Sequence, residues 1–505
     1  MGRSPIFRAL GRALSQARAA NLRDSGAAPP VSRRAFLKGS AAVGTLAFAG
    51  CLPGPRLTAT PRVAVVGAGL AGLSAAYRLE KAGFACRVFE ARARVGGRVA
   101  TATADGLTLN MGGEFVNSDH LDMLALANEL GIELIDRRDD TTDQPIPAVA
   151  YYFRGKSIAE NELADALRPL AVAIGSDADR LDKDEERVAP ELDRISVAEY
   201  LNRHAMELGE PYLRPLIETA IRSEYGVEPS ESSALQLIAL LPTVDGQRVD
   251  VLGASDEALV VKGGSARLAE MLASRLAGRV ETGRRLQAIQ MADDAYRLVF
   301  SPGASVDADW VILALPFPPL RRVSLDVELP AKLRRFIAET GPGANEKIIA
   351  TFRRRAWRVP EGFTREAWTD LAFAEVWDSS SGQAERENGA LTFFYGSHGT
   401  RDVAGAVPVD GLARYVPGLA AQATGRTLRT GWSADPLTGG AYTNLRPGQA
   451  TEFAEYFWGD EREVRAGRIL FAGEQTSESY YGYMNGAAET GRLAAAAVVR
   501  HVTGV

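Results

Sequence analysis

The stretch RVAVVGAGLAGLSAAYRLEKAGFACRVFE, from Arg62 to Glu90, reads in order as an apolar strand, a glycine turn, a helix and a second strand. Its three glycines, Gly67, Gly69 and Gly72, have the spacing G-x-G-x-x-G and follow a valine-rich run. Apolar residues then recur at intervals of three, which is typical of the buried face of a helix. The stretch therefore predicts the strand–turn–helix–strand unit of an α/β, Rossmann-like domain.

This glycine spacing suits the binding of a dinucleotide, because each glycine has a physical task. The first allows the tight turn, the second lets the backbone approach a pyrophosphate, and the third lets the helix pack closely on the strand. Glu90 ends the second strand, 23 positions after Gly67, where a carboxylate can accept hydrogen bonds from an adenosine ribose. The spacing alone is weak evidence, but in this context it predicts a dinucleotide site.

Directly after Glu90 comes ARARVGGRVAT, in which arginines surround a pair of glycines. Guanidinium charge and close backbone would both favour phosphate at this position. The run resembles the FAD-binding signature of the flavin amine oxidase superfamily, with Arg92, Gly97 and Arg98 among the matching residues. A nicotinamide dehydrogenase would not need these arginines, so the predicted cofactor is FAD.

The resemblance to this family, whose members include monoamine oxidases and L-amino acid oxidases, extends over nearly the whole chain after the first 60 residues. It implies a two-domain FAD-dependent amine oxidase fold, with a Rossmann-like FAD domain and an α+β substrate domain. The segments that carry it are LNMGGEFVNS (109–118), VVKGGSARLAEMLASRL (260–276), DADWVILALPFPPLRRV (307–323), GANEKIIATFRRRAW (343–357), GWSADPLTGGAYTNLRPG (431–448) and FAGEQTSESYYGYMNGAAETGRLAA (471–495).

The same resemblance implies how the chain is divided between the domains. Residues 60–116, 258–325 and 430–500 would form a discontinuous FAD domain. Residues 117–257 and 326–429 would form the substrate-binding domain.

Three residues are expected to act on the substrate or on oxygen. In the family, two aromatic rings face each other across the substrate amine, and the matching residues are Tyr442 in GGAY and Tyr483 in GYMNG. Such an aromatic cage orients an amine through the π faces of its rings. Lys347 matches the family's flavin-proximal lysine, which would hold a water against flavin N5 and assist oxygen reduction. Core packing of the tyrosines and a surface position of the lysine are the alternatives.

Other residues take their expected roles from the same resemblance. Glu114, Phe115 and Tyr481 are expected near the substrate, although packing is the favoured role for Tyr481. Ala441 stands where some eukaryotic members have a cysteine bonded to the flavin, so FAD is expected to be non-covalent. The implied cofactor contacts are Gly67, Gly69, Gly72, Glu90, Arg92, Gly97, Arg98, Gly113, Glu114, Val280, Gly473, Glu474 and Met484.

The implied reaction oxidises an amine to an imine, which water hydrolyses to a carbonyl compound and ammonia, while O2 is reduced to hydrogen peroxide. An L-amino acid oxidase is the favoured member, because GGEFVNSDH and GYMNGAAETG look most like bacterial exported members. No arginine follows the glycine pair at 112–113, where venom-type enzymes clamp the substrate carboxylate, which leaves Arg222 as another candidate. An oxidase of primary amines or polyamines without a carboxylate is the alternative.

Two other classes of protein share part of this pattern. A flavin desaturase or porphyrinogen oxidase would have the same glycine-rich segments, but Lys347 and the paired tyrosines argue against it. The other class is a flavin-bearing binding protein without turnover. Replacing Tyr442 and Tyr483 would separate the classes, because an oxidase would lose its reductive half-reaction.

The first 51 residues resemble an export signal. SRRAFLKG (32–39) precedes a ten-residue apolar run that is too short to span a bilayer. Its paired arginines are typical of the twin-arginine route, so we expect the twin-arginine translocation machinery as a partner and a periplasmic or secreted protein. AFAGC also resembles a lipoprotein cleavage box, which would attach the protein to a membrane through Cys51.

Charge and composition exclude further classes. The full chain has a net charge of −5, and residues 1–50 hold eight basic residues and one acidic residue, so the remainder is strongly acidic. It lacks the basic face that nucleic-acid binding requires. Four scattered histidines and two cysteines have no metal-ligand spacing, so no metal site is expected. The oligomeric state stays open, with a homodimer as one option.

Overall fold

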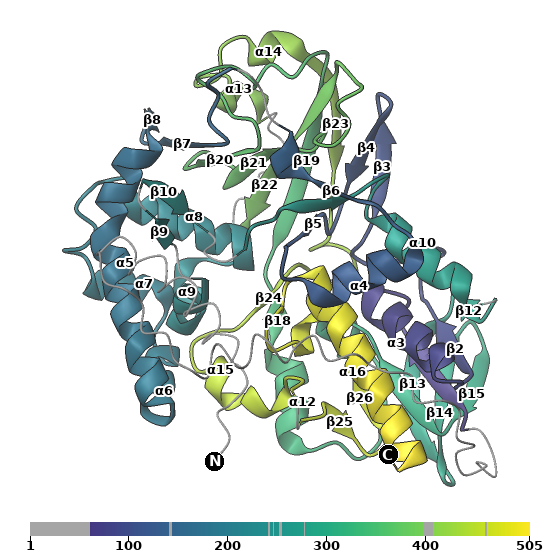
Figure 1. Ribbon diagram of the computed structural model, residues 1–505. Coiled ribbons are helices and arrows are strands. Elements are labelled where there is room, and N and C mark those ends of the chain that lie inside the picture. The colour runs from purple at the N-terminus through teal and green to yellow at the C-terminus, as the bar shows by residue number, and fades with distance from the viewer. Residues whose placement is uncertain are drawn as a thin grey trace, which may run out of the picture.

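The computed structural model describes residues 61–140, 144–240, 243–245, 247–251, 255–276, 278–397, 408–459 and 462–504. The expected export signal, including Cys51, lies outside the described residues. Within those ranges, none of the helices is both long enough and apolar enough to cross a membrane. Figure 1 shows three regions around a common centre: a sheet with its covering helices, a second sheet, and a group of helices.

The stretch from Arg62 to Glu90 forms β1 (Val63–Val66), α3 (Leu70–Lys81) and β2 (Cys86–Phe89), as its pattern predicts. β1 and β2 lie inside a six-stranded sheet of order β12-β2-β1-β16-β26-β25. Every neighbouring pair is parallel except β25 with β26. The α/β, Rossmann-like fold is therefore confirmed. The other strands are β12 (Val280–Glu281), β16 (Trp310–Leu313), β25 (Arg465–Ala466) and β26 (Ile469–Phe471).

The last helix of the chain packs along α3, the first helix of this sheet. α16 (Met484–Thr503) and α3 lie side by side in Figure 1, and a Cβ at Gly491 would lie only 2.2 Å from the carbonyl oxygen of Ala71. This close contact brings the start of α16 next to the glycine turn before α3. Two further helices pack nearby: α4 (Leu121–Leu130) and α10 (Ala266–Arg275).

A seven-stranded sheet forms the second region, in the order β23-β19-β22-β21-β20-β7-β8. All eight residues of β19 and all eight of β22 are buried, so the centre of this sheet is enclosed on both faces. A charged side chain on these strands therefore needs a partner inside the protein. The strands are β7 (Val149–Phe153), β8 (Lys156–Ile158), β19 (Asn345–Phe352), β20 (Glu366–Thr369), β21 (Glu375–Asp378), β22 (Gly389–Gly396) and β23 (Ala423–Arg429).

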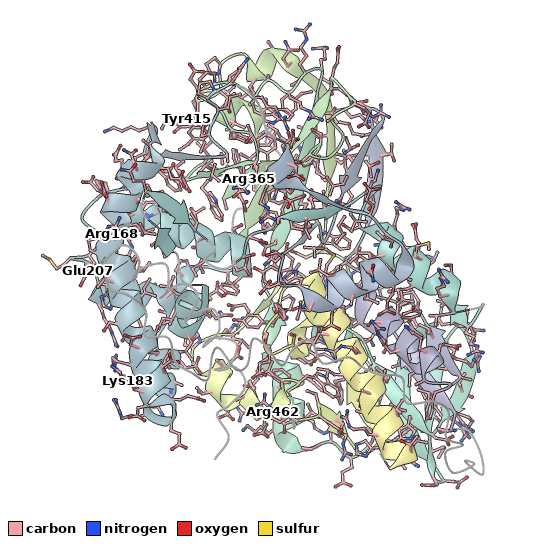
Figure 2. All side chains as sticks on the ribbon, in the orientation of Figure 1. Arg168, Lys183, Glu207, Arg365, Tyr415 and Arg462 are labelled. Carbon is pink, nitrogen blue, oxygen red and sulfur yellow. The ribbon has the colours of Figure 1, made fainter. Side chains whose placement is uncertain are left out.

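Helices α5 to α9 form the third region and cover one side of the molecule. Figure 2 shows Arg168, Lys183 and Glu207 along its outer edge. α8 runs from this region toward the centre of the molecule (Figure 1) and packs against β20 and β22. The helices are α5 (Glu160–Lys183), α6 (Glu185–Asp193), α7 (Val197–Arg203), α8 (Leu213–Tyr225) and α9 (Ala234–Leu240).

Smaller elements connect these regions. A four-stranded sheet of order β15-β14-β13-β17 packs on the six-stranded sheet, where the rings of Phe300 and Phe89 lie 4.5 Å apart. The remaining elements are β3 (Thr101–Ala104), β4 (Leu107–Asn110), β9 (Thr243–Asp245), β10 (Arg248–Asp250), β13 (Arg285–Ala292), β14 (Ala295–Ser301), β15 (Ala304–Ala308), α11 (Phe317–Leu320), β17 (Ser324–Asp326), α12 (Ala331–Glu339), β18 (Gly341–Pro342), α13 (Val409–Leu412), α14 (Leu419–Gln422), β24 (Thr443–Asn444) and α15 (Gln449–Glu452).

The two expected domains are less separate than residue ranges suggest. α4 falls in the segment assigned to the substrate domain, yet the backbone N–H of Met123 on α4 donates to the Asn485 side chain on α16 at 3.0 Å. A small sheet also crosses the expected boundary, since β11 (Leu259–Val261) pairs with both β5 (Phe115–Val116) and β6 (Leu134–Asp136). Segments from both sides of the boundary are therefore joined by hydrogen bonds.

Candidate active site

A deep cleft of about 1400 Å³ opens at the carboxyl end of β1. Its lining combines the glycine turn, the arginine-rich run, the loop after β16 and the start of α16. A crevice beyond the carboxyl ends of parallel strands is where α/β sheets bind dinucleotides. The predicted cofactor residues that line it are Gly67, Gly69, Glu90, Arg92, Gly97, Arg98, Gly113, Gly473, Glu474 and Met484.

The glycine turn shows why two positions need glycine for different reasons. A Cβ at Gly72 would lie 1.9 Å from the Gly67 carbonyl oxygen, so only glycine allows α3 to pack here. A Cβ added at Gly69 would have no described protein atom within 4 Å apart from its chain neighbours, because it would point into the cleft. α3 begins directly after Gly69 without a side-chain cap, which leaves its first N–H groups available to a phosphate.

Glu90 holds this turn in place. One carboxylate oxygen accepts from the backbone N–H of Ala68 at 2.8 Å, and the other accepts from the backbone N–H of Arg92 at 2.7 Å. The guanidinium of Arg92 pairs with Asp435 at 2.7 Å, which ties the arginine-rich run to the C-terminal part of the chain. The site therefore fits FAD through three features: the first N–H groups of α3, the open space at Gly69 and the Glu90 carboxylate at the cleft wall.

Val280 does not take the place expected for it. It lies on the edge strand β12, paired with Val88, and the cleft is lined instead by the residues that follow. The chain turns at Gly283, which has a φ of +71°, and then passes along the cleft through Arg284, Arg285 and Leu286.

Glu474 connects the cofactor cleft with both cage tyrosines. Its carboxylate pairs with Arg98 at 2.9 Å and accepts from the Thr443 hydroxyl at 2.9 Å. The other oxygen accepts from the backbone N–H of Gly482 at 2.6 Å. Thr443 follows Tyr442 and Gly482 precedes Tyr483, so a single buried carboxylate fixes the backbone beside each of the two tyrosines.

Tyr442 and Tyr483 both line the cleft, and both also line a second cavity of about 650 Å³. The two spaces share a wall that includes Gly112, Gly113 and Lys347. Burial raises the pKa of both tyrosine hydroxyls, so they are neutral. The structure therefore places two neutral aromatic rings where a cofactor cleft meets a smaller cavity.

A family model described as flavin-containing amine oxidoreductase matches residues 70–499. The chain belongs to this family. The oxidoreductase is 28% identical over 465 residues to a Mycobacterium tuberculosis protein described as a flavin-containing monoamine oxidase, AofH, with 87% of this chain and 96% of that protein covered. It is 23% identical to pseudooxynicotine dehydrogenase of Pseudomonas, with 94% and 97% covered.

Solved structures show the same fold. Putrescine oxidase bound to putrescine matches with a TM-score of 0.74 at 23% identity, covering 87% of this chain and 99% of that one. Cyclohexylamine oxidase from Brevibacterium oxydans matches with a TM-score of 0.70 at 21% identity, covering 88% and 100%. The predicted family, fold and class of enzyme are thus confirmed, and the family implies a flavin cofactor, FAD.

The second cavity of the oxidoreductase is acidic. Its charged lining residues are the four carboxylates Glu114, Glu224, Glu257 and Glu375 and the single cation Lys347. Aromatic rings of Phe115, Trp377 and Phe394 provide the apolar walls. Phe115 therefore lies beside the expected substrate space, with its ring edge-on to Trp377 at 5.4 Å.

Lys347 does not offer a free ammonium group. It lies on β19 and pairs with Glu114 at 2.7 Å, and both side chains are 5% exposed. Its Nζ also donates to the carbonyls of Gly112 at 2.9 Å and Asn110 at 3.2 Å. Three acceptors use its three N–H groups, so the expected water at flavin N5 would have to replace one of them. Glu114 is thereby a partner of Lys347, and it lines the second cavity rather than the cofactor cleft.

Two glutamates of this cavity, Glu257 and Glu375, form a cluster with Glu366, which does not line it. One carboxylate oxygen from each of Glu257, Glu366 and Glu375 lies within 4.8 Å of the others. Burial and the neighbouring Glu366 raise the pKa of Glu257 to about 8, and burial together with Glu257 raises the pKa of Glu375. Glu257 also has a φ of +41°, a strained conformation for a non-glycine residue. No ligand spacing predicts this cluster, because its members come from separate segments.

Arg137 lies behind this cluster. It is 1% exposed, its guanidinium lies 4.1 Å from the centre of the Phe115 ring, and it donates to the Glu257 carbonyl at 3.1 Å. Its charge is 3.7 Å from Glu366. Arg137 does not line the cavity, so its positive charge partly neutralises the carboxylates of the cluster from behind the cavity wall.

Two more residues near the cage escaped the sequence analysis. Glu224 at the end of α8 forms a hydrogen bond with the Tyr483 hydroxyl. His120 is fully buried, and its ring stands edge-on to Tyr483 at 5.2 Å. Burial lowers the pKa of His120 to about 4, so its imidazole is neutral. Tyr481 stacks on Tyr225 at 6.2 Å and lines neither space, which agrees with packing.

Proposed function

We propose that this flavin-containing amine oxidoreductase oxidises a primary amine that lacks a carboxylate and carries a second positive charge, such as an α,ω-diamine or a polyamine. The observation that carries the proposal is the lining of the second cavity, in which four carboxylates face one lysine that is already paired. Burial and mutual repulsion raise the pKa values of Glu257 and Glu375, and an entering ammonium group favours their ionised form. A cavity lined in this way accepts cations and repels a carboxylate.

The lining weighs against the favoured L-amino acid. A substrate carboxylate needs a cation or several N–H donors, and Lys347 is bound to Glu114. Arg222, the other candidate clamp, pairs with Glu228 at 2.8 Å and lines neither the cleft nor the second cavity. The alternative of an amine without a carboxylate is therefore supported better.

Each part of the site has a role in this function. FAD bound in the cleft supplies an acceptor for a hydride from the carbon next to the amine nitrogen and returns the electrons to O2, which gives hydrogen peroxide. Tyr442 and Tyr483 orient the reacting amine between their rings. Glu257 and Glu375, which line the second cavity, bind the second ammonium group and so set which carbon reaches the cofactor.

FAD is proposed to be held without a covalent bond, since Ala441 lines the cleft where some family members have the linking cysteine. Export through the twin-arginine route, and anchoring through Cys51, remain proposals that rest on the sequence alone. The FAD proposal is checked by denaturing the protein, which should release all of its flavin into the supernatant.

Three related amines test the substrate class. Butylamine has one positive charge, 1,4-diaminobutane has two, and L-ornithine is the diamine with a carboxylate added. Each would be mixed anaerobically with FAD-loaded protein, and the rate of flavin bleaching would be followed, with longer and shorter diamines to find the best length. We expect the preferred diamine to exceed the matching monoamine about 10- to 100-fold in kred/Kd, the value of one charge-assisted hydrogen bond.

Glu375→Gln gives the matched variant. It keeps the side-chain volume and the acceptor for Ser223, but removes a carboxyl group that could ionise beside a bound ammonium group. We expect the preference for diamine over monoamine to fall about tenfold, because one charge-assisted contact is weakened. Faster bleaching by L-ornithine than by any diamine would contradict the proposal in favour of an L-amino acid oxidase.

A further inference from the structure

We propose that Glu224 is the proton acceptor for the substrate: its carboxylate takes the proton from the reacting ammonium group at the cage, so that the amine is oxidised in its neutral form. This inference rests on the proposed oxidation of amines at this site. It assigns Glu224 a role in the reaction itself, in addition to the general acidity of the cavity.

The position of Glu224 suits this task. It lies in the last turn of α8, just before the helix ends at Gly226, and its side chain lines the second cavity. Its carboxyl group forms a hydrogen bond with the hydroxyl of Tyr483. An ammonium group held between Tyr442 and Tyr483 would therefore lie next to this carboxylate.

The hydroxyl of Tyr483 can accommodate both protonation states of Glu224. It donates to the Ser255 hydroxyl at 3.2 Å, which leaves its oxygen free to accept from a protonated Glu224. When Glu224 is ionised, the tyrosine can turn its proton toward the carboxylate instead. The hydrogen bond thus persists while the proton moves, and the tyrosine ring need not leave the cage.

Within the part of the chain that the structure describes, the groups that act electrostatically on Glu224 include no cation, and Lys347, which lines the same cavity, is paired with Glu114. The titratable groups that face it are Tyr225 on its own helix, Tyr481 and Tyr483 on the C-terminal segment, Tyr442, and Glu257. The four tyrosines are neutral because burial raises their pKa values, and burial together with Glu366 raises the pKa of Glu257 to about 8. An incoming ammonium group therefore meets a carboxylate that has no positive partner among these groups.

The energetics agree with proton transfer in this geometry. Burial raises the pKa of Glu224 to about 7, although the hydrogen bond from Tyr483 opposes the rise. An alkylammonium group has a pKa of about 10 in water, and burial between two rings lowers it. The two groups approach each other in proton affinity when the substrate leaves water, so the proton can move at little cost.

The step balances without another reactant. One N–H bond of the ammonium group breaks, and one O–H bond forms on Glu224. The nitrogen keeps the electron pair, which would then assist transfer of the hydride from the α-carbon to FAD, the two-electron acceptor of the proposed function, and would become the second bond of an iminium ion. The proton stays on Glu224 until the product leaves and solvent reaches the cavity.

The test is the pH profile of flavin reduction in Glu224→Gln. In the wild type, kred/Kd should rise with pH through a midpoint near 7, because Glu224 must be ionised to accept the proton. In the variant only the neutral amine reacts, so the midpoint should move to about 10, the pKa of the free amine. At pH 7.5 the variant should be slower on the order of 100-fold, and near pH 10.5 the two should converge.

A less basic substrate separates this role from a structural one. An alkylamine with fluorines on its β-carbon is neutral at the assay pH and needs no acceptor. The difference between wild type and Glu224→Gln should nearly vanish with this substrate. A variant that is slow at every pH and with every amine would overturn the proposal, as would a variant whose pH midpoint does not move.

Binding measured by calorimetry gives a readout without turnover. The ligand is an amine that has no hydrogen on its α-carbon, titrated at pH 8.5 in two buffers of different ionisation enthalpy. The wild type should release almost no proton, because Glu224 keeps it, whereas Glu224→Gln should release about one. Equal proton release in both proteins would contradict the proposal.

Glu375→Gln is the control, since it removes a carboxyl from the same cavity whose hydrogen bond is to Ser223 and not to a cage tyrosine. It should change Kd for diamines but keep the pH midpoint of the wild type. If no amine bleaches the flavin of the wild type, the proposed function fails. If amines bleach it and Glu224→Gln keeps the midpoint, only the role of Glu224 fails.

Discussion

Gly72→Ala is expected to lower the free energy of unfolding by about 3 kcal/mol or more and to yield protein that retains little FAD. The added Cβ would lie 1.9 Å from the carbonyl oxygen of Gly67 and 3.2 Å from the Ala314 side chain. Neither the turn nor α3 can move away easily, because α16 packs on the other side of α3. Urea unfolding of the apoprotein measures the first effect and the ratio of flavin to protein absorbance the second.

Gly69→Ala is the matched control for this prediction. Its Cβ meets no protein atom within 4 Å, and Gly69 has a φ of −72°, which alanine adopts without strain. The apoprotein should unfold at nearly the wild-type urea concentration, while the affinity for FAD should fall about tenfold or more, because the methyl group occupies the space of the pyrophosphate. Equal stability of the two variants would contradict the assignment of Gly72 to packing and Gly69 to the cofactor.

Lys347→Met is expected to lower the free energy of unfolding by about 3 to 5 kcal/mol, the usual result of removing one partner from a buried ion pair. Glu114 would lose the ammonium group that lies 2.7 Å from it, in a place where its side chain is 5% exposed. Three buried acceptors would lose a donor together, namely Glu114 and the carbonyls of Gly112 and Asn110. The unfolding midpoint in urea, with the same FAD loading in each sample, measures the change.

The double variant Glu114→Gln/Lys347→Met completes the cycle. It leaves no unpaired charge, so it should recover at least about 2 kcal/mol of the loss caused by Lys347→Met alone. Glu114→Gln alone should cost less than Lys347→Met, because the glutamine oxygen still accepts a hydrogen bond. If the double variant loses as much unfolding free energy as the two single variants together, then Glu114 and Lys347 are not coupled in stability.

The sequence could reveal the cofactor cleft because each of its parts is a short continuous motif. Gly67 and Gly69 stand in one turn, and Arg98 belongs to the run that follows Glu90. Tyr442 and Tyr483 could be predicted to lie beside the cleft for the same reason, since each stands in its own recognisable segment. The spacing of residues within a motif predicts a site wherever one turn or one helix start determines which residues come together.

The acidic cavity could not be found in this way. Glu224 ends a helix, Glu257 precedes β11, and Glu375 begins β21, so no spacing connects them. They meet because β21 pairs with β22, and because α8, more than a hundred positions earlier in the chain, packs across β22. The contacts between the two expected domains could not be predicted for a related reason: β11 pairs with β5 and β6 across the proposed division.

Glu474 has a consequence for the order in which the active site is made. Its carboxylate reaches Arg98 near the start of the described chain, Thr443 beside one cage tyrosine, and Gly482 beside the other. A nascent chain that has not yet emerged as far as Gly482 holds the glycine turn but has no second half of the cage. We therefore expect that the enzyme gains the capacity to produce peroxide only when translation of its final helix is complete.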